Sequence, residues 1–148
     1  PRDVTDNAIP SGSSMATDVL LRLSVITGDP EFKRRAVSAL RSARTVMERF
    51  PGGAGHWLCA LDFYLGTPKE VAIIGDRAAS DTQALLSEVY RNFLPNRVLV
   101  GSDGPSAGLP LMQGREKIDG RATVYVCQDY VCQLPVNEAS ALADQLAD

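Results

Sequence analysis

Residues 55–76 read GHWLCALDFYLGTPKEVAIIGD, and within this stretch a helical pattern gives way to a strand pattern. The first half, about 55–65, is apolar around most of a helical circumference, so we expect a helix that is buried on all sides. A Gly-Thr-Pro sequence at 66–68 ends it. Residues 71–74 are then apolar on both faces, as central parallel strands are. The stretch therefore separates a helical part from a part with strands.

Two amphipathic helices are predicted upstream of this stretch. Ser13 or Ser14 can cap the first helix, and Gly28 can end it. Asp29 and Pro30 then have the residue types of an N-cap and a first helical position, which begin a longer second helix. Because the turn between them is very short, the two helices are expected to form an antiparallel hairpin.

A strand–helix–strand unit is predicted downstream. Ser80 with Gln83 fits a capping box at the start of its helix, and the apolar residues 98–100 form the second strand. Residues 101–121 are rich in Gly, Pro and Ser and predict a long surface excursion from which a short apolar segment docks back. Residues 123–127 predict a third strand, which a last helix follows.

The expected fold class is α/β, or α+β for the chain as a whole. Residues 1–66 form a helical hairpin with a buried helix, and residues 67–148 form a small βαβ unit of three layers. A chain of 148 residues has the length of one ordinary domain, so we expect the two parts to share one compact core.

The composition excludes several function classes. The net charge is −3 with 22% charged residues, and neither half is basic enough to predict nucleic-acid binding. The basic run at 33–35 is interpreted as a solvated helix face. No apolar run reaches the roughly 18 residues of a membrane span, and the first residues lack the layout of a signal peptide. We therefore expect a cytoplasmic protein that contacts no membrane.

Cys127 and Cys132 are the redox candidates. If Asp129 and Tyr130 formed a two-residue hairpin turn, the two cysteines would face each other at disulfide distance. However, Asp-Tyr is a poor sequence for such a turn, and the spacing is not that of a C-x-x-C redox motif. Three interpretations stay open: reduced cysteines near the core, a disulfide or redox pair, and a metal site. A second pair of ligands, which a zinc site needs, is absent from the sequence.

The catalytic candidates are Asp6, Asn7 and His56. Asp6 and Asn7 lie with Asp3 in a loop, where paired carboxylates serve glycosidic chemistry but are also ordinary turn residues. His56 is the only histidine, and Cys59 lies one helical turn from it. A Cys-His nucleophile pair needs a third, orienting group. The alternative is a histidine at a helix start, next to a buried cysteine. No nucleotide-binding or metal-ligand motif is present, so no cofactor is expected.

Four stretches together resemble one family. They are DNAIPSGSSMATDVLLRL at 6–23, GHWLCALDFYLGTPKEVAIIGD at 55–76, FLPNRVL at 93–99 and YVCQDYVCQLPV at 125–136. In order and spacing they are similar to the C-terminal end of the spermatogenesis-associated-protein-20-like family, also called YyaL-type or thioredoxin-domain-containing proteins. The Asp-Asn-Ala-x-Pro-Ser-Gly run and the Cys-x4-Cys-x-x-Pro-Val run are the most specific parts.

The resemblance implies a longer parent protein. Its N-terminal domain would be thioredoxin-like, and an (α/α)-barrel region similar to six-hairpin glycosidases and sugar 2-epimerases would follow. This chain would hold the last helical hairpins of that barrel and the tail. Asp6 and Asn7 would lie on a loop at one end of the barrel, and His56 would begin one of its last helices. The family usually has Gly-Asn-Ser where this chain has Gly-Ser-Ser at 12–14.

Three functional hypotheses follow. The first is a structural or interaction module without a complete catalytic site, whose partners are the parent's thioredoxin-like and barrel regions or a second copy of the chain. The second is one wall of a carbohydrate-active pocket of the epimerase or hydrolase kind, to which Asp6, Asn7 and His56 contribute. The third is a thiol-redox role of Cys127 and Cys132. The sequence leaves open whether the chain takes part in catalysis.

Overall fold

The computed structural model describes residues 4–104, 108–129 and 131–147. It divides into two compact units, residues 1–67 and residues 68–148. The first unit is helical and the second contains a small mixed sheet with helices, so the predicted α+β class is confirmed. Each unit is described by itself below. The core that we expect the two parts to share stays a prediction.

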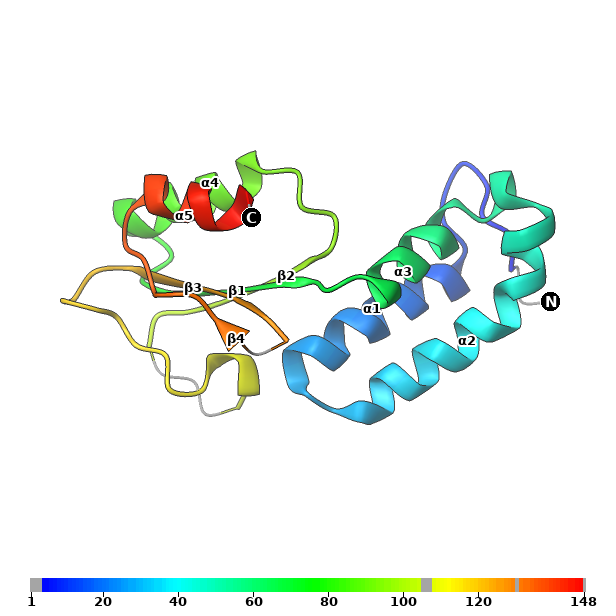
Figure 1. Cartoon of the computed structure of the whole chain (residues 1–148), viewed down its shortest axis with the longest axis horizontal. Coiled ribbons are helices and arrows are strands. Elements are labelled where there is room, and N and C mark those ends of the chain that lie inside the picture. Colours follow the sequence, from blue (N-terminus) through cyan, green and yellow to red (C-terminus); the bar gives the residue numbers. More distant parts are fainter. Residues whose placement is uncertain (1–3, 105–107, 130, 148) are drawn as a thin grey trace. The chain divides into compact units, whose positions relative to one another are not determined.

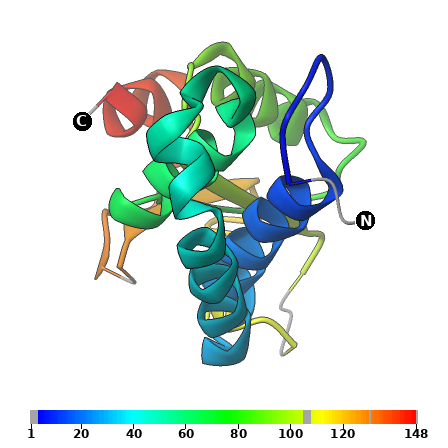
Figure 2. The ribbon, with the colours of Figure 1, turned by 90° about the vertical axis from the view of Figure 1, so that its right-hand side faces the viewer.

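The first unit is a helical hairpin with a third helix. Its elements are α1 (Gly12–Thr27), α2 (Pro30–Arg49), the 3-10 turn η1 (Pro51–Gly53) and α3 (Gly55–Leu65). Helices α1 and α2 run antiparallel and side by side, as predicted (Figures 1 and 2). Gly28 ends α1 in the left-handed conformation with φ of 69°, and the Asp29 carboxylate accepts a hydrogen bond from the Glu31 N–H. Both predicted turn signals are therefore confirmed.

The start of α1 differs from the prediction. Ser11, and not Ser13 or Ser14, is the N-cap, and its hydroxyl oxygen accepts a hydrogen bond of 3.2 Å from the Ser14 N–H. Several adjacent serines have the same capping propensity, so local sequence does not distinguish them. Asp6 determines which serine is the N-cap, because its carboxylate accepts a hydrogen bond of 2.8 Å from the Ser11 N–H.

The expectation that α3 is buried on all sides is wrong for the described residues. Trp57, Ala60 and Phe63 are buried, whereas Leu58 is 38% exposed and Leu65 is 73% exposed. Among the described helical elements of this unit, α1, α2 and η1 pack against α3, and they cover part of its circumference. An apolar pattern shows which residues prefer burial but not how many neighbours are present to bury them.

The second unit is built on a four-stranded mixed sheet in the order β2-β1-β3-β4. Strands β1 (Lys69–Ile74) and β2 (Arg97–Ser102) are parallel and joined through α4 (Ser80–Arg91), which confirms the predicted strand–helix–strand unit. Strand β3 (Thr123–Gln128) pairs antiparallel with β1, and β4 (Val131–Cys132) extends β3 as a hairpin. The third predicted strand is therefore also present.

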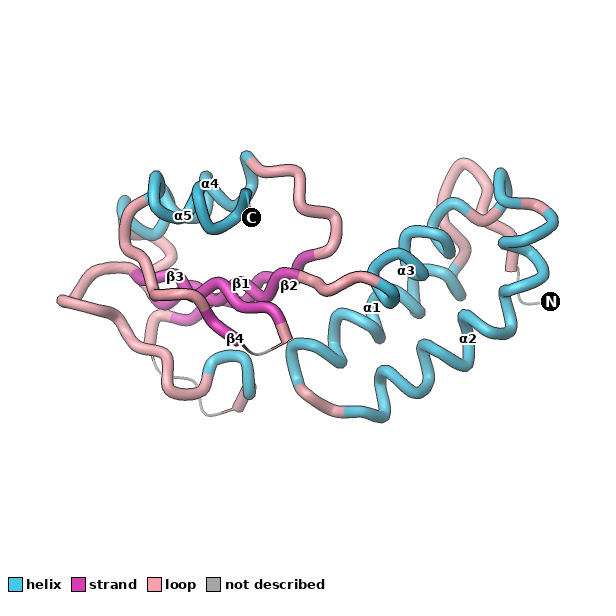
Figure 3. Tube along the Cα trace, viewed as in Figure 1, coloured by secondary structure: helices cyan, strands magenta, loops and turns pink. Residues whose placement is uncertain are grey.

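The two faces of the sheet are covered differently, as Figure 3 shows. Helices α4 and α5 (Ala139–Ala147) pack on one face and on each other. The other face is covered by the 3-10 turn η2 (Pro110–Met112), so a loop with a single turn forms the third layer. Leu111 and Met112 are buried there, as expected for the segment that docks back. The main core lies under the two helices and comprises Val71, Ile73, Leu85, Val89, Ala122, Val124, Val126, Leu142 and Leu146.

The predicted capping box of α4 is wrong. Ala79 is the N-cap, and no side chain caps the helix from this position. The Asp81 carboxylate accepts hydrogen bonds from the N–H groups of Thr82, in the first turn, and of Ala122, the residue just before β3. Gln83 donates to the Arg77 carbonyl instead of reaching back to a serine. The first turn is thus tied to β3, a contact that local sequence could not indicate.

Among the residues described, no helix combines the length and apolarity that crossing a membrane would require.

Gly75 gives a first testable prediction. A Cβ atom at this position would lie 2.9 Å from the Ala122 Cβ and closer still to the Thr82 hydroxyl, and both neighbours are buried. We expect Gly75→Ala to lower the free energy of unfolding by about 1–3 kcal/mol, measured by urea unfolding. Gly101→Ala is the control, because its nearest neighbour is the Ile73 carbonyl oxygen at 3.6 Å. Equal effects of the two substitutions would contradict this packing.

Candidate functional site

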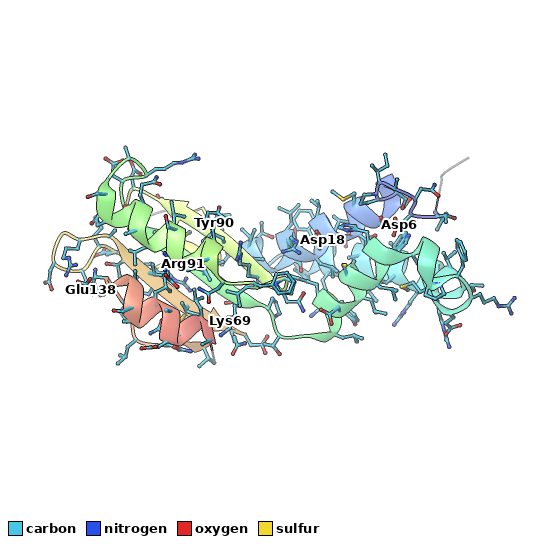
Figure 4. The ribbon with its side chains drawn as sticks, turned by 90° about the horizontal axis from the view of Figure 1, so that it is seen from above. Asp6, Asp18, Lys69, Tyr90, Arg91 and Glu138 are labelled. Carbon is cyan, nitrogen blue, oxygen red and sulfur yellow. A yellow bond between two sulfur atoms is a disulfide. The ribbon has the colours of Figure 1, made fainter. Side chains whose placement is uncertain are left out.

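The Asp6 carboxylate lies between the first turns of α1 and α3 and is 6% exposed (Figure 4). Its Oδ1 atom accepts hydrogen bonds from the Ser11 N–H at 2.8 Å and from the Ser14 hydroxyl at 2.6 Å. Its Oδ2 atom accepts from the N–H groups of His56 at 2.8 Å and Trp57 at 3.2 Å. One side chain therefore caps two helices that are far apart in the sequence.

Helix α3 depends on this carboxylate because its own N-cap residue, Ala54, has no side chain that accepts a hydrogen bond. The N–H groups of a first helical turn have no partner within the helix and carry a partial positive charge. Two further hydrogen bonds fix the segment, from the Asp6 N–H to the Gly53 carbonyl and from the Trp57 indole N–H to the Val4 carbonyl, both 2.8 Å. The segment that contains Asp6 is thus part of the helical unit.

The surroundings of Asp6 set its charge. Burial alone would raise the pKa of this carboxyl, but the hydrogen bonds from Ser11, Ser14, Trp57 and His56 outweigh burial and hold the pKa below its ordinary value. Asp6 is therefore ionised at neutral pH and cannot serve there as a proton donor. Both oxygens are engaged by helix termini, which is the geometry of a structural carboxylate.

The other candidates in this unit are Asn7, next to Asp6, and two residues of α3, and they do not form a catalytic group with Asp6. The Asn7 side chain is exposed. His56 begins α3, as predicted, and its Nε2 atom is buried without a hydrogen-bond partner among the described residues. Cys59 is exposed, so the expected buried cysteine next to His56 is wrong. Asp6 contacts His56 through the backbone N–H, and a carbohydrate-active role of these residues stays a prediction.

A second candidate site lies on the β3–β4 hairpin. Cys127 and Cys132 are directly opposite each other in the antiparallel register and form a disulfide. Of the three interpretations left open by the sequence, the structure thus contains the disulfide. Asp129 adopts the left-handed conformation, with φ of 48°, at the turn. Tyr130, the other residue of the predicted turn, lies outside the described residues.

Arg115 completes this site, although it was not among the candidates selected from the sequence. Its Nη2 group lies 3.1 Å from the Cys127 Sγ and 3.5 Å from the Cys132 Sγ and donates to both sulfurs. The guanidinium also stacks over the Tyr125 ring, 5.4 Å from the ring centre. Burial lowers the pKa of Arg115, and the charges of Glu70 and Tyr125 oppose that decrease. Because arginine has so high a pKa, the group stays positively charged at neutral pH.

The sheet explains why these groups meet. Glu70 is directly opposite Cys127 in the β1–β3 register, and directly opposite residues of neighbouring strands point to the same face. This is the face that η2 covers, and the loop after η2 carries Arg115. Glu70 is buried near the start of β1, next to Lys69, and a buried carboxylate needs a cation or hydrogen-bond donors beside it. The sequence did not identify which cation, because the loop has no periodicity.

The described residues hold no group of three or more His, Cys, Asp and Glu side chains arranged to bind a metal ion.

Comparison with known proteins places the chain in context. It is 33% identical to spermatogenesis-associated protein 20 of Homo sapiens over 146 residues, which cover 95% of this chain and 19% of that protein. The mouse protein of the same name is 32% identical over 146 residues, with 95% and 18% covered. An uncharacterised protein of Caenorhabditis elegans is 25% identical over 142 residues, with 94% and 19% covered. No family model matches the chain. No solved structure matches it significantly.

The matches show that this α+β chain corresponds to one segment of larger proteins, since it spans about a fifth of the length of the curated relatives it matches. The chain is related to the spermatogenesis-associated protein 20 family, over a segment consistent with the C-terminal portion of that family. The resemblance predicted from the sequence is therefore confirmed.

Asp6 gives the second prediction. In Asp6→Asn, an amide NH2 replaces one carboxylate oxygen and faces N–H or O–H donors, so we expect the free energy of unfolding to fall by about 2–4 kcal/mol at pH 7. The folded-state pKa of Asp6 is lowered, so its contribution is fully present above the unfolded pKa of about 4 and is lost as the pH falls through the folded pKa.

Urea unfolding between pH 7 and pH 2 measures this difference. The gap between the native protein and Asp6→Asn should narrow towards pH 2. Asn7→Ala is the matched control, because the neighbouring side chain is exposed, and its effect should stay within about 0.5 kcal/mol at every pH. A gap that stays constant with pH would show that the charge of Asp6 does not stabilise the helix starts.

Proposed function

We propose that the chain is a structural and interaction module of a larger protein and carries no complete catalytic site. Its partner is the helical region of the parent protein that the resemblance places before it. The observation that carries this proposal is a set of exposed apolar side chains on α1 and α3. Met15 is 43% exposed, Val19 is 47% exposed and Leu58 is 38% exposed.

The spacing of these residues supports a docking surface. Met15 and Val19 lie one helical turn apart on α1, so they share a face, and Leu58 and Leu65 lie two turns apart on α3. Single exposed apolar residues are ordinary on a protein surface, but apolar residues that recur on one helix face favour packing against another element. A helical barrel supplies such elements, because each of its hairpins packs against its neighbours.

The relatives supply the length that this partner needs. About four fifths of the human and rat proteins lies outside the matched segment. This length leaves room for both a barrel and a thioredoxin-like domain. Without that region, a second copy of the chain is the nearest source of an apolar face. We therefore propose that the isolated chain forms homo-oligomers through this surface.

Sedimentation velocity tests this proposal. We expect the 148-residue chain to associate as its concentration rises, and a variant with Val19→Glu and Leu58→Glu to remain monomeric, because charges replace apolar contact area. Thr45→Glu is the control, since it introduces a charge at an exposed polar position of α2. A native chain that stays monomeric at high concentration, or variants that all associate equally, would contradict the proposed surface.

A second function, thiol–disulfide exchange, is favoured by the geometry of the β3–β4 hairpin. A structural disulfide needs no charged neighbour, whereas here a buried guanidinium donates to both sulfurs. A nearby positive charge is the feature that lowers thiol pKa values at reactive cysteines. We propose that Cys127 and Cys132 exchange electrons with a dithiol, and that the thioredoxin-like region implied by the resemblance supplies that dithiol.

Mass spectrometry under graded glutathione redox buffers measures this role. The pair should pass between a disulfide and a dithiol that is two hydrogen masses heavier within the range those buffers span, while Cys59 alkylates in both states because it is exposed and free. A pair that stays oxidised in the most reducing buffer, or stays reduced under mild oxidation, would overturn the redox proposal.

A further inference from the structure

The two sulfurs of the disulfide differ in access. Cys132 is exposed on the short edge strand β4, whereas Cys127 on β3 is only 2% exposed. Val131, next to Cys132, is also exposed, so an incoming thiol can reach this end of the hairpin. Thiol–disulfide exchange begins with attack of a thiolate on one sulfur, and the other sulfur leaves as a thiolate. Access therefore favours Cys132 as the attacked atom and Cys127 as the leaving group.

Arg115 is placed to receive the charge of that leaving group. Its Nη2 group is already 3.1 Å from the Cys127 Sγ, and its Nη1 group is buried without a hydrogen-bond partner. A hydrogen bond from a guanidinium to a thiolate is charge-assisted and stronger than one to a neutral sulfur. When the disulfide opens, the buried negative charge on Cys127 thus forms beside a buried positive charge.

Other charged and titratable groups surround this pair, and one of them opposes Arg115. Glu70 faces Cys127 from β1 and is 2% exposed, so its negative charge disfavours a thiolate. Tyr125 on β3 lies under the guanidinium, and Lys69 on β1 lines the hollow beside the disulfide while its Nζ donates to the Gln145 carbonyl. Removal of Arg115 and removal of Glu70 should therefore shift the redox equilibrium in opposite directions.

The hairpin is held without the disulfide. The Gln133 N–H donates to the Val126 carbonyl at 3.0 Å, and Val124 and Val136 exchange two backbone hydrogen bonds of 2.8 and 3.0 Å. The disulfide spans a sequence separation of 5, and cross-links that close short loops constrain the unfolded chain least. Reduction of the pair is thus compatible with an intact sheet.

We propose that Arg115 makes Cys127–Cys132 a reducible centre by stabilising the Cys127 thiolate when a dithiol attacks Cys132. A thiolate of the dithiol bonds to the Cys132 Sγ, the Cys127–Cys132 bond breaks, and its electron pair stays on the Cys127 Sγ. The second thiolate of the dithiol then breaks the mixed disulfide and releases Cys132, which takes up a proton. The dithiol becomes a disulfide, and the protein pair gains two electrons. This inference rests on the proposed thiol–disulfide role.

The test uses the full chain with Cys59→Ser, so that the pair holds the only cysteines. Glutathione buffers of graded ratio set the equilibrium, and alkylation with mass spectrometry measures the reduced fraction. We expect Arg115→Met to lower the equilibrium constant for reduction about tenfold, a potential about 30 mV more negative. Arg115→Lys should recover part of the effect because the charge is kept. Arg121→Met is the control, since Arg121 is half exposed and pairs with Glu138.

Three further readouts separate thiolate stabilisation from a structural effect. Glu70→Gln should raise the reduced fraction. In the reduced protein, thiolate absorbance should show a cysteine that titrates below the ordinary pKa of about 8.5, and Arg115→Met should raise that pKa. A variant with Cys127→Ser, which keeps Cys132, should form a mixed disulfide with Ellman's reagent at least about tenfold faster than one with Cys132→Ser.

The outcomes distinguish this inference from the role on which it rests. If the pair titrates in the glutathione buffers but Arg115→Met behaves like Arg121→Met, the assignment of Arg115 is wrong and the thiol–disulfide role stands. If the native pair cannot be reduced in these buffers, both the assignment of Arg115 and the thiol–disulfide role are wrong. If Arg115→Met does not fold, the reduced fractions of the Arg115→Lys and Glu70→Gln variants test the role of Arg115 instead. A lower reduced fraction in Glu70→Gln than in the native chain would overturn the inference.

Discussion

The helical unit depends on one buried carboxylate that caps two helix starts. The hydrogen bonds of Asp6 to the first turn of α3 join residues 50 and 51 positions apart, and those to Ser11 and Ser14 fix the start of α1. A buried charge is unfavourable unless hydrogen bonds compensate it, and here four donors do so. The same side chain therefore determines where α1 begins, how α3 begins, and how the segment before α1 is held.

The parts of the fold that the sequence predicted are those governed by local backbone chemistry. Gly28, Asp29 and Pro30 mark the turn between α1 and α2 because left-handed backbone, capping and a fixed φ are properties of single residues. The strands at 71–74 and 98–100 were predicted because short apolar runs are typical of central strands. The pairing of Cys127 with Cys132 depends on the length of the turn between them, so the sequence left it as one of three interpretations. The start of α1 was missed because adjacent serines are equivalent until the distant Asp6 carboxylate selects one.

The rest of the candidate site could not be predicted because it is made by tertiary contacts. Arg115 lies in an irregular loop, and only the docking of η2 on the sheet brings its guanidinium to the sulfurs. The exposed face of α3 was missed for a related reason, since an apolar helix pattern does not state whether its neighbours belong to the same segment. The prediction of an α4 capping box was wrong for the same reason, because the Asp81 carboxylate in the first turn accepts a hydrogen bond from Ala122, in the loop before β3.

The exposed Cys59 has a practical consequence for work on the longer relatives. While Cys127 and Cys132 are joined, Cys59 is the one free thiol of this chain, and it lies on the outward side of α3 together with Leu58. A fluorophore or a photo-crosslinker attached through this sulfur would sit on the apolar helix surface itself, without any engineered cysteine. In a full-length protein that carries the same cysteine, the fluorophore would report whether that surface is covered, and the crosslinker would mark the covering segment.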